Sequence, residues 1–554
     1  MQRPPRGTSQ ATPAFGEAGE PDLPDAVMTA VSAVEQLHAR TGAPTAGTGL
    51  QPAPDEGVDV LAVAIAAAPK TTVREDTEEA LHPTPQPRRG AVETALWYEA
   101  DVAARAATAG ITGKAGETLL VEPPAAKAGS LPAKLIFLGV GDESVQSMRR
   151  AGAALARATR GALRIRAAVV DGLDPAAQQA FVEGFLLGGY RAPRRGKTPA
   201  GPPMAREMAV TGLDPEALNG ARITARAVWL TRDLTNLPPD IATPDWMAAQ
   251  SRAVAARAGL EISVLDEAGL RRKGFGGLLA VGSGSAHPPR LVEISYRPAS
   301  GGGEHIVLAG KGITFDSGGI SLKPRDAMMT MKMDMAGAAV VLAAVEAAAA
   351  LGLPHRVTGV LALAENAIGG SAYRPGDVVT TYDGTTVEIG NTDAEGRMVL
   401  ADALAYAAAE LNPDALVDVA TLTGAAALGL GQHHGALFTN SPRLLAALEK
   451  AGSDSGDRIW QLPLVHEYEY ALESDTADLA HVAPPALHFG AGAIVAALFL
   501  EKFVDGVPWA HIDIAGPMRA GSDSHEIAKG ATGFGTRLLI SYLRNASRPG
   551  TPAP

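Results

Sequence analysis

The residues best suited to chemistry in this chain are two carboxylates and an arginine that stand close together. The segment Asn391–Arg397 reads Asn-Thr-Asp-Ala-Glu-Gly-Arg, so a single residue separates each of Asp393, Glu395 and Arg397 from the next. Carboxylate oxygens are ligands that hard divalent cations accept in proteins. The two carboxylates therefore suggest a metal site.

A second charged cluster lies upstream, in a segment rich in glycine. It comprises two lysines and two aspartates: Lys311, Asp316, Lys323 and Asp334. The glycines around Lys311 and Asp316 permit tight turns and close approach of a ligand to the backbone. Taken alone, this segment is equally typical of a surface turn, and Asp334 is more typical of a helix N-cap than of a metal ligand. The lysine spacing does not fit a nucleotide P-loop.

These residues, in this order and spacing, resemble the leucine aminopeptidase family, the cytosolic metal-dependent aminopeptidases that work as hexamers. The resemblance extends from about Arg226 to Leu539 and rests on long contiguous strings. Seven functional positions of the family are matched without a change of residue type: Lys311, Asp316, Lys323, Asp334, Asp393, Glu395 and Arg397. Their joint agreement favours the metal site over the alternatives that each segment leaves open by itself.

The resemblance implies a centre of two metal ions. Asp316 and Glu395 would bridge the ions, because the two oxygens of a carboxylate can hold a metal pair about 3.5 to 4 Å apart. Asp393 would complete the shell of one ion, and Asp334 with the Lys311 amine would complete that of the other. A lysine ligand must be neutral, and two adjacent dications can lower its pKa far below the usual value of about 10.4.

The resemblance also implies how the reaction is catalysed. The two ions would polarise the peptide carbonyl, bind the free α-amine and lower the pKa of a bridging water. Lys323 would stay protonated and stabilise the developing oxyanion, while Arg397 would hold a bicarbonate that acts as general base. The implied cofactors are thus two divalent ions per subunit, Mn²⁺ or Zn²⁺, together with bicarbonate. The chain has no cysteine, so the metal ligands must be oxygen or nitrogen.

Two further segments are implied to contact the substrate. The loop Ala420–Ala425 matches the family's substrate loop, although by itself it is also an ordinary strand-to-helix turn. The implied substrate-binding residues are Met331, Asn391, Thr421, Leu422 and Gly424. The histidines form no His-Glu-x-x-His pattern, and no catalytic role is assigned to them. The sequence departs from the family's usual residues at 366–370 and 389–390.

Composition limits the classes of protein to which the chain can belong. Its 554 residues exceed the roughly 250 to 300 at which single cores stop growing, so two domains or more are expected. The 48 basic and 60 acidic side chains give a net charge of −12, which disfavours nucleic acid and anionic membranes as partners. Residues 1–25 lack the apolar core of a secretory signal. We expect a cytoplasmic protein without membrane attachment.

Alternating strand and helix patterns predict an α/β fold with two domains. In the N-terminal domain, strands are expected near 58–65, 118–121, 134–140 and 163–170, and helices over 147–159 and 175–190. In the catalytic domain, strands near 260–264, 290–295, 305–309, 357–363 and 415–420 predict a mixed, mainly parallel sheet with helices on both faces. The apolar stretch Ala336–Leu353 contains Glu346 and many alanines, and is expected to be a buried helix rather than a membrane span.

The proposed division of the chain follows from these patterns. Residues 1–57 hold eight prolines and little apolar sequence, which predicts a disordered extension. An N-terminal α/β domain is expected over 58–215, with an exposed basic loop at 191–205 near its end. A helix beginning near 215 joins it to the catalytic domain, expected over 216–545, and 546–554 form a tail.

The leading functional hypothesis is a leucyl aminopeptidase-type metalloexopeptidase that removes leucine or other apolar residues from the N-termini of peptides. A dipeptidase using the same site, for example on Cys-Gly, is an alternative. DNA binding is a third hypothesis, supported only by the basic stretch Arg191–Lys197 and opposed by the net charge. A homohexamer is implied by the resemblance alone.

Overall fold

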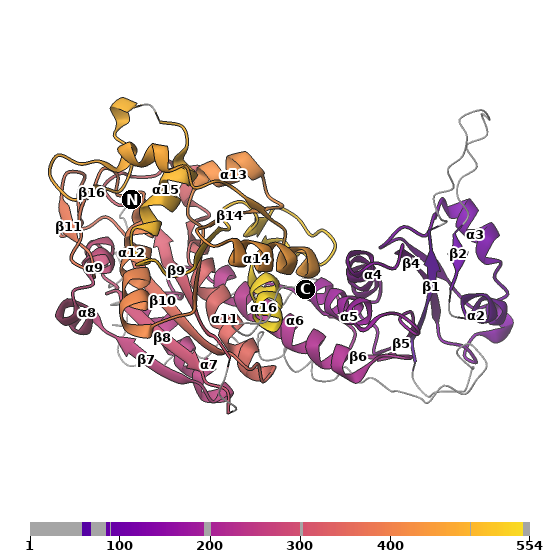
Figure 1. Cartoon of the computed structure of the whole chain (residues 1–554). Coiled ribbons are helices and arrows are strands. Elements are labelled where there is room, and N and C mark those ends of the chain that lie inside the picture. The colour runs from indigo at the N-terminus through magenta and orange to yellow at the C-terminus, as the bar shows by residue number, and fades with distance from the viewer. Residues whose placement is uncertain are drawn as a thin grey trace, which may run out of the picture.

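The computed structural model describes residues 58–67, 85–88, 90–192, 201–299, 303–487 and 489–546. The disorder predicted for residues 1–57 and the tail beyond residue 546 lie outside the described residues, as does most of the basic stretch within 191–205. The described part contains a smaller N-terminal domain and a larger domain, joined by one long helix (Figure 1). The predicted α/β architecture is confirmed.

The N-terminal domain is built on a sheet with strand order β3-β4-β1-β5-β6, and β2 pairs with the end of β1. Strands β4, β1, β5 and β6 are parallel, whereas β3 and β2 are antiparallel to their neighbours. The strands are β1 (Val60–Ala66), β2 (Gln86–Pro87), β3 (Thr118–Val121), β4 (Lys134–Gly141), β5 (Arg164–Ala168) and β6 (Glu207–Val210). The helices are α2 (Ala91–Trp97), α3 (Val102–Ala109), the short η1 (Ala125–Lys127), α4 (Val145–Ala158) and α5 (Pro175–Gly189).

The two faces of this sheet have separate cores. Helices α4 and α5 cover the face turned toward the larger domain, and α2 and α3 cover the opposite face (Figure 1). Strand β1 is buried along its whole length, as its continuous apolar sequence requires. The helix α6 (Pro215–Asn236) then runs into the larger domain, with its N-terminus capped by Asp214. The domain boundary near residue 215 stays a prediction, and α6 begins at that point.

The larger domain contains an eight-stranded sheet with order β15-β14-β17-β13-β9-β10-β8-β7. Its four central strands, β17, β13, β9 and β10, are parallel, while β14, β8 and β7 run antiparallel to their inner neighbours. The strands are β7 (Glu261–Leu265), β8 (Arg290–Tyr296), β9 (His305–Asp316), β10 (Arg356–Asn366), β13 (Ala415–Ala420), β14 (Gly435–Thr439), β15 (Ile459–Gln461) and β17 (Trp509–Asp513). This is the mixed, mainly parallel sheet expected from the sequence.

Helices cover both faces of the large sheet. One face packs against α6, α7 (Pro244–Ala258), α11 (Ala336–Ala350), α14 (Pro442–Ser455) and α16 (Thr536–Asn545). The other packs against α8 (Glu267–Lys273), α9 (Gly276–Gly282), α12 (Glu395–Tyr406) and α15 (Gly492–Glu501). The remaining elements are α10 (Arg325–Met328), η2 (Met331–Met333), η3 (Ala407–Leu411), α13 (Gly424–Leu430), η4 (His466–Leu472), η5 (Pro485–Leu487), β11 (Val378–Thr380), β12 (Thr386–Glu388), β16 (Leu479–Ala480), β18 (Arg519–Ala520) and β19 (Gly530–Ala531).

Strand β9 differs from its sequence-based prediction. The glycines at 310 and 312 were expected to make turns, but the strand continues through them to Asp316. A Cβ atom at Gly310 would lie 2.7 Å from the Cα of Ala338 on α11. These glycines therefore let helix α11 pack closely on the strand. The tight turn begins only after Asp316, where Gly318 and Gly319 have φ of 87° and 63°.

The alanine-rich helix α11 lies in the core, as predicted. Within the described residues, the helical stretch Arg325–Ala350 has the length and apolar composition of a membrane span, but 89% of its most apolar window is buried inside the protein. A core helix meets the same criteria. Small side chains on α11 allow it to sit between the large sheet and helices α6 and α16.

Candidate active site

The predicted site residues gather where parallel strands of the large sheet end. Asp316 is the last residue of β9, and Thr421 directly follows the neighbouring parallel strand β13. Glu395 is the first residue of α12, and Asp393 lies two residues before it. The carboxyl ends of parallel strands form an edge at which open α/β sheets bind ligands. The topology thus brings segments far apart in the sequence to one place.

Three carboxylates converge closely at this edge. One oxygen from each of Asp316, Asp393 and Glu395 lies within 4.8 Å of the other two. Asp316 and Glu395 are almost completely buried, whereas Asp393 is partly exposed. Burial, followed by repulsion from Glu395, raises the pKa of Asp316 to about 6. Burial also raises the pKa of Asp393. Positive charge is needed to hold such a cluster ionised.

Lys311 lies on the inner side of the cluster. Its Nζ is 2.9 Å from Asp334 Oδ2 and 2.8 Å from Glu395 Oε1, and it donates a hydrogen bond of 2.8 Å to the carbonyl of Thr421. Burial opposes its charge, but Asp334 and Glu395 outweigh that effect and raise the pKa of Lys311. The amine therefore stands between the side chains with which it would share a metal ion.

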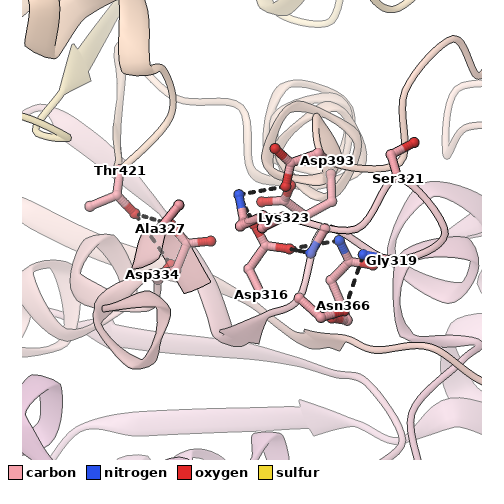
Figure 2. A network of polar contacts seen from close by, with 12 residues as sticks. Asp316, Gly319, Ser321, Lys323, Ala327, Asp334, Asn366, Asp393 and Thr421 are labelled. Atoms are coloured by element: carbon pink, nitrogen blue, oxygen red, sulfur yellow. Dashed lines mark hydrogen bonds and ion pairs between the residues drawn. The ribbon is translucent and has the colours of Figure 1, made fainter. Parts of the chain in front are cut away.

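Lys323 lies on the outer side of the cluster. Its Nζ is 2.8 Å from Asp316 Oδ2 and 2.5 Å from Asp393 Oδ1 (Figure 2). Burial by itself lowers the pKa of Lys323, but the negative charge of Asp316 outweighs that effect and raises it. The side chain is therefore an ammonium near neutral pH. Unlike Lys311, its side chain is partly exposed. Its position fits a group that faces the substrate.

The turn after β9 holds Asp316 in place. Asp316 Oδ1 accepts hydrogen bonds of 2.8 Å from the backbone N–H of Gly318 and from Nδ2 of Asn366. Asn366 also donates to the carbonyl of Thr392, which joins this turn to the segment that carries Asp393. The residues 366–370 had been noted only as a departure from the family's usual sequence. The structure shows that Asn366 supports a predicted ligand.

Arg397 is buried one turn into helix α12. Its Nη1 donates to the carbonyl of His481, and its Nε has no hydrogen-bond partner among the described residues. Burial lowers the pKa of Arg397 to about 10, so it remains charged near neutral pH. A buried guanidinium with an unused donor is suited to hold a small anion.

His481 is a supporting residue that sequence reasoning did not single out. It follows β16 and is fully buried, and burial lowers its pKa to about 3. Its Nδ1 lies 3.2 Å from the backbone N of Gly390, and its Nε2 lies 2.9 Å from the carbonyl oxygen of Asn391. A neutral imidazole with hydrogen on Nε2 satisfies both contacts. No motif surrounds His481, so only the fold reveals that it holds the segment before Asp393.

Asp513 is a second supporting residue that was missed. It ends strand β17, and its oxygens accept hydrogen bonds from the backbone N–H groups of Leu422 and Thr423 and from the Thr423 hydroxyl. Thr421 is tied to the metal cluster by a hydrogen bond of 2.6 Å from its hydroxyl to Asp334 Oδ1. The predicted substrate loop is therefore fixed at both ends beside the carboxylates.

A cavity of about 700 Å³ opens over the cluster. Its lining includes six charged residues of the predicted site: Lys311, Asp316, Lys323, Asp334, Asp393 and Glu395. Four of the five predicted substrate-binding residues also line it: Met331, Thr421, Leu422 and Gly424. Asn391 does not; its side chain is exposed and accepts a hydrogen bond from the backbone N–H of Asp393. Its predicted contact with substrate therefore has no support in this geometry.

Comparison with known proteins places this site in a family. Sequence models described as the catalytic and N-terminal domains of the cytosol aminopeptidase family match residues 229–540 and 97–195. A probable cytosol aminopeptidase of Roseiflexus castenholzii is 44% identical over 455 residues, covering 78% of this chain and 91% of its own. One from Chlorobium limicola is 41% identical over 460 residues, and the match covers 78% of this chain and 90% of that relative. The chain belongs to the cytosol aminopeptidase family.

A solved structure agrees with this membership. The bottromycin maturation enzyme BotP in complex with Mn is 38% identical, with a TM-score of 0.76, and the match covers 88% of this chain and 99% of that one. The protein is therefore an enzyme of the metal-dependent aminopeptidase class, and its two domains are those of the cytosol aminopeptidase family. The resemblance drawn from the site motifs is confirmed.

The residues present fit the metal ions that the cytosol aminopeptidase family uses. Buried carboxylates and one amine converge, and oxygen and nitrogen are the donors that Mn²⁺ and Zn²⁺ accept. The space around Lys311 is also restricted, since a Cβ at Gly396 would lie 2.7 to 2.8 Å from its last three side-chain atoms. Only glycine at 396 leaves the amine free to reach the carboxylates.

The metal affinity of this site should fall steeply with pH below about 6. The pKa of Asp316 is raised to about 6, so below that value protons compete for an oxygen that a metal ion needs. Above it the carboxylate is ionised and affinity rises. Calorimetric titration with Mn²⁺ should show Kd rising by about tenfold or more per pH unit below about pH 6. An affinity that stays flat from about pH 5 to 8 would show that no site carboxyl titrates there.

Proposed function

We propose that the protein hydrolyses the first peptide bond of peptides that begin with leucine or another apolar residue. The observation that carries this proposal is that six of the seven predicted charged residues line a single cavity, together with residues of the substrate loop. A free α-amine and a peptide carbonyl could both reach the metal site from that cavity. Membership of the aminopeptidase family gives the class of reaction.

Five side chains would hold the two divalent ions: Lys311, Asp316, Asp334, Asp393 and Glu395. When bound, the ions supply Lewis acidity for the carbonyl, a site for the α-amine and a water that ionises near neutral pH. For Lys311 to contribute its lone pair, it must lose the proton that Asp334 and Glu395 stabilise. Mn²⁺ is our first choice of metal, because the solved relative is described in complex with Mn; Zn²⁺ suits the same donors.

The chain's own residues would then orient and stabilise the reacting groups. Lys323, an ammonium beside Asp316 and Asp393, would stabilise the oxyanion that forms on the scissile carbonyl. Arg397, with its buried unused Nε, would bind bicarbonate, which would supply a general base beside the reacting groups. Backbone groups of Leu422 and Gly424, in a loop held by Asp513, would align the peptide.

The cavity wall supports a preference for apolar N-terminal residues. Met331, Leu422, Ala427, Leu428 and Met518 line it together with the polar cluster. Flexible methionine side chains adapt to substrates of different shape, which suits a broad apolar preference rather than a single residue. Cytoplasmic location and a homohexameric assembly complete the proposal; both rest on the family resemblance, and the relatives carry the name cytosol aminopeptidase.

The test uses a peptide of about seven residues that begins with leucine, and the same peptide with an acetylated N-terminus. Mass spectrometry should show stepwise loss of single residues from the free peptide only, because the site needs an α-amine. Cleavage confined to dipeptides such as Cys-Gly would favour the dipeptidase alternative. Cleavage of the acetylated peptide would contradict the proposal. Retention on DNA that falls with salt would support the additional binding role.

A further inference from the structure

The last turn of helix α6 contacts two segments that adjoin the cavity wall. One is η2, which carries Met331 and ends next to Asp334. The other is the hairpin of β18 and β19, which directly follows Met518. Met331 and Met518 both line the cavity. Neither α6 contact belongs to the metal site described above.

Lys332 attaches η2 to the end of α6. Its Nζ donates a hydrogen bond of 2.6 Å to the carbonyl of Asn236, the last residue of the helix. The last carbonyls of a helix lack partners within the helix, and a cation is favoured at that end. The lysine is half-buried. This bond fixes the residue between Met331 and Met333.

The side chain of Asn236 attaches the hairpin to the same turn. Its Oδ1 accepts a hydrogen bond of 3.0 Å from the backbone N–H of Ala531. The hairpin approaches so closely that a Cβ at Gly530, where φ is 99°, would lie 2.5 Å from this oxygen. One turn earlier, the fully buried Arg232 donates from Nε to the carbonyl of Thr532 at 2.8 Å. The hairpin is thus held at two points.

The same turn is bound to the N-terminal domain. Asn236 Nδ2 donates to the hydroxyl of Tyr190 at 3.2 Å, and that hydroxyl donates to Asp233 at 2.9 Å. Arg232 Nη1 donates to the carbonyl of Leu187 at the end of α5. The position of the turn is therefore set by packing outside the catalytic domain as well as within it.

We propose that Lys332 and Asn236 are positioning residues that set the spacing between Met331 and Met518, and so determine which N-terminal side chains the cavity accepts. The inference rests on the proposed aminopeptidase function. It is physically reasonable because one methylene group in an apolar pocket changes selectivity by about 10- to 200-fold. A small shift of Met331 or Met518 would change the selectivity for the N-terminal side chain by a comparable amount.

The experiment compares the ratio of kcat/KM for leucine and alanine p-nitroanilides in Lys332→Met and Asn236→Ala. Each variant should change this ratio by about tenfold, with Mn²⁺ content unchanged. Lys332→Arg keeps a donor and should restore most of the ratio. Lys450→Met, which removes an exposed lysine paired with Asp454 on α14, is the matched control and should leave the ratio unaltered. Equal losses for both substrates, or a ratio within about twofold of the unaltered enzyme, would overturn the inference.

Failure of the proposed aminopeptidase function can be distinguished from failure of the positioning role of Lys332 and Asn236. If the unaltered protein with Mn²⁺ hydrolyses neither anilide, the aminopeptidase proposal is wrong for these substrates. The dissociation constants of free leucine and alanine, measured by calorimetry on the same variants, then test the spacing without turnover. A leucine-to-alanine ratio of dissociation constants that shifts in Lys332→Met and not in Lys450→Met supports the inference. Identical ratios, or no binding of either amino acid, overturn it.

Discussion

Replacing Glu395 by glutamine should abolish both metal retention and catalysis. The variant keeps the shape of the side chain but removes one of the carboxylates that meet Lys311 and the other acids within the cluster. Because the proposed bridging position requires two anionic oxygens, we expect kcat to fall by about 10³- to 10⁴-fold. Metal analysis after gel filtration should show a matching loss of bound Mn²⁺.

Thermal stability separates this effect from damage to the fold. The unaltered protein should gain in Tm when Mn²⁺ is added, because a ligand that binds only the folded state stabilises it. Glu395→Gln should lose that gain while its Tm without added metal stays close to that of the unaltered protein. Glu410→Gln, in the turn of helix that follows α12, is exposed and is the matched control. A Glu395→Gln enzyme with normal metal content and normal kcat would refute the assigned role.

Replacing Lys323 by methionine should slow the reaction without removing the metal. Methionine preserves most of the side-chain volume but not the ammonium, which lies 2.8 Å from Asp316 and 2.5 Å from Asp393. Loss of one oxyanion-stabilising donor costs about 10²- to 10³-fold in kcat, or roughly 3 to 4 kcal/mol. KM should change little, because the ammonium acts mainly on charge that develops in the transition state.

The metal affinity of the same variant decides between two roles for Lys323. The ammonium repels cations, so its removal should leave Mn²⁺ affinity equal or higher. Lys323→Arg keeps the charge and should retain more activity than Lys323→Met. If Lys323→Met instead loses its metal together with its activity, Lys323 is needed to keep the metal site intact, and its proposed role in stabilising the oxyanion is wrong.

Much of the fold and the site could be read from the sequence because the information is local. The apolar run Val60–Ala66 is a buried strand, as is Ala415–Ala420, which is apolar apart from Asp418, and alternating strands and helices predict the parallel sheet. The charged site residues lie in contiguous motifs, so they could be recognised in the sequence. The structure then showed that Lys311 reaches Asp334 and Glu395, which lie 23 and 84 positions further on. That meeting depends on strand order, which spacing alone does not determine.

The parts that were missed depend on tertiary contacts. Gly310 and Gly312 lie in a segment expected to permit tight turns, but both are within strand β9, and Gly310 serves the close packing of α11 against that strand. His481 and Asp513 act through backbone groups of other segments, so no side-chain pattern marks them. Asn391 was assigned to the substrate pocket, but it is not among the residues that line the cavity. Its neighbour Asp393 nevertheless lies in the cluster.

The most direct test of a two-metal aminopeptidase is a titration of metal-stripped protein with Mn²⁺, with initial rates on leucine p-nitroanilide and bound metal measured on the same samples. The rate should be negligible at the start and rise with bound metal until about two ions per chain are present. Glu395→Gln should recover neither metal nor rate. Full activity in the stripped protein, or equal recovery in Glu395→Gln, would contradict the proposed mechanism.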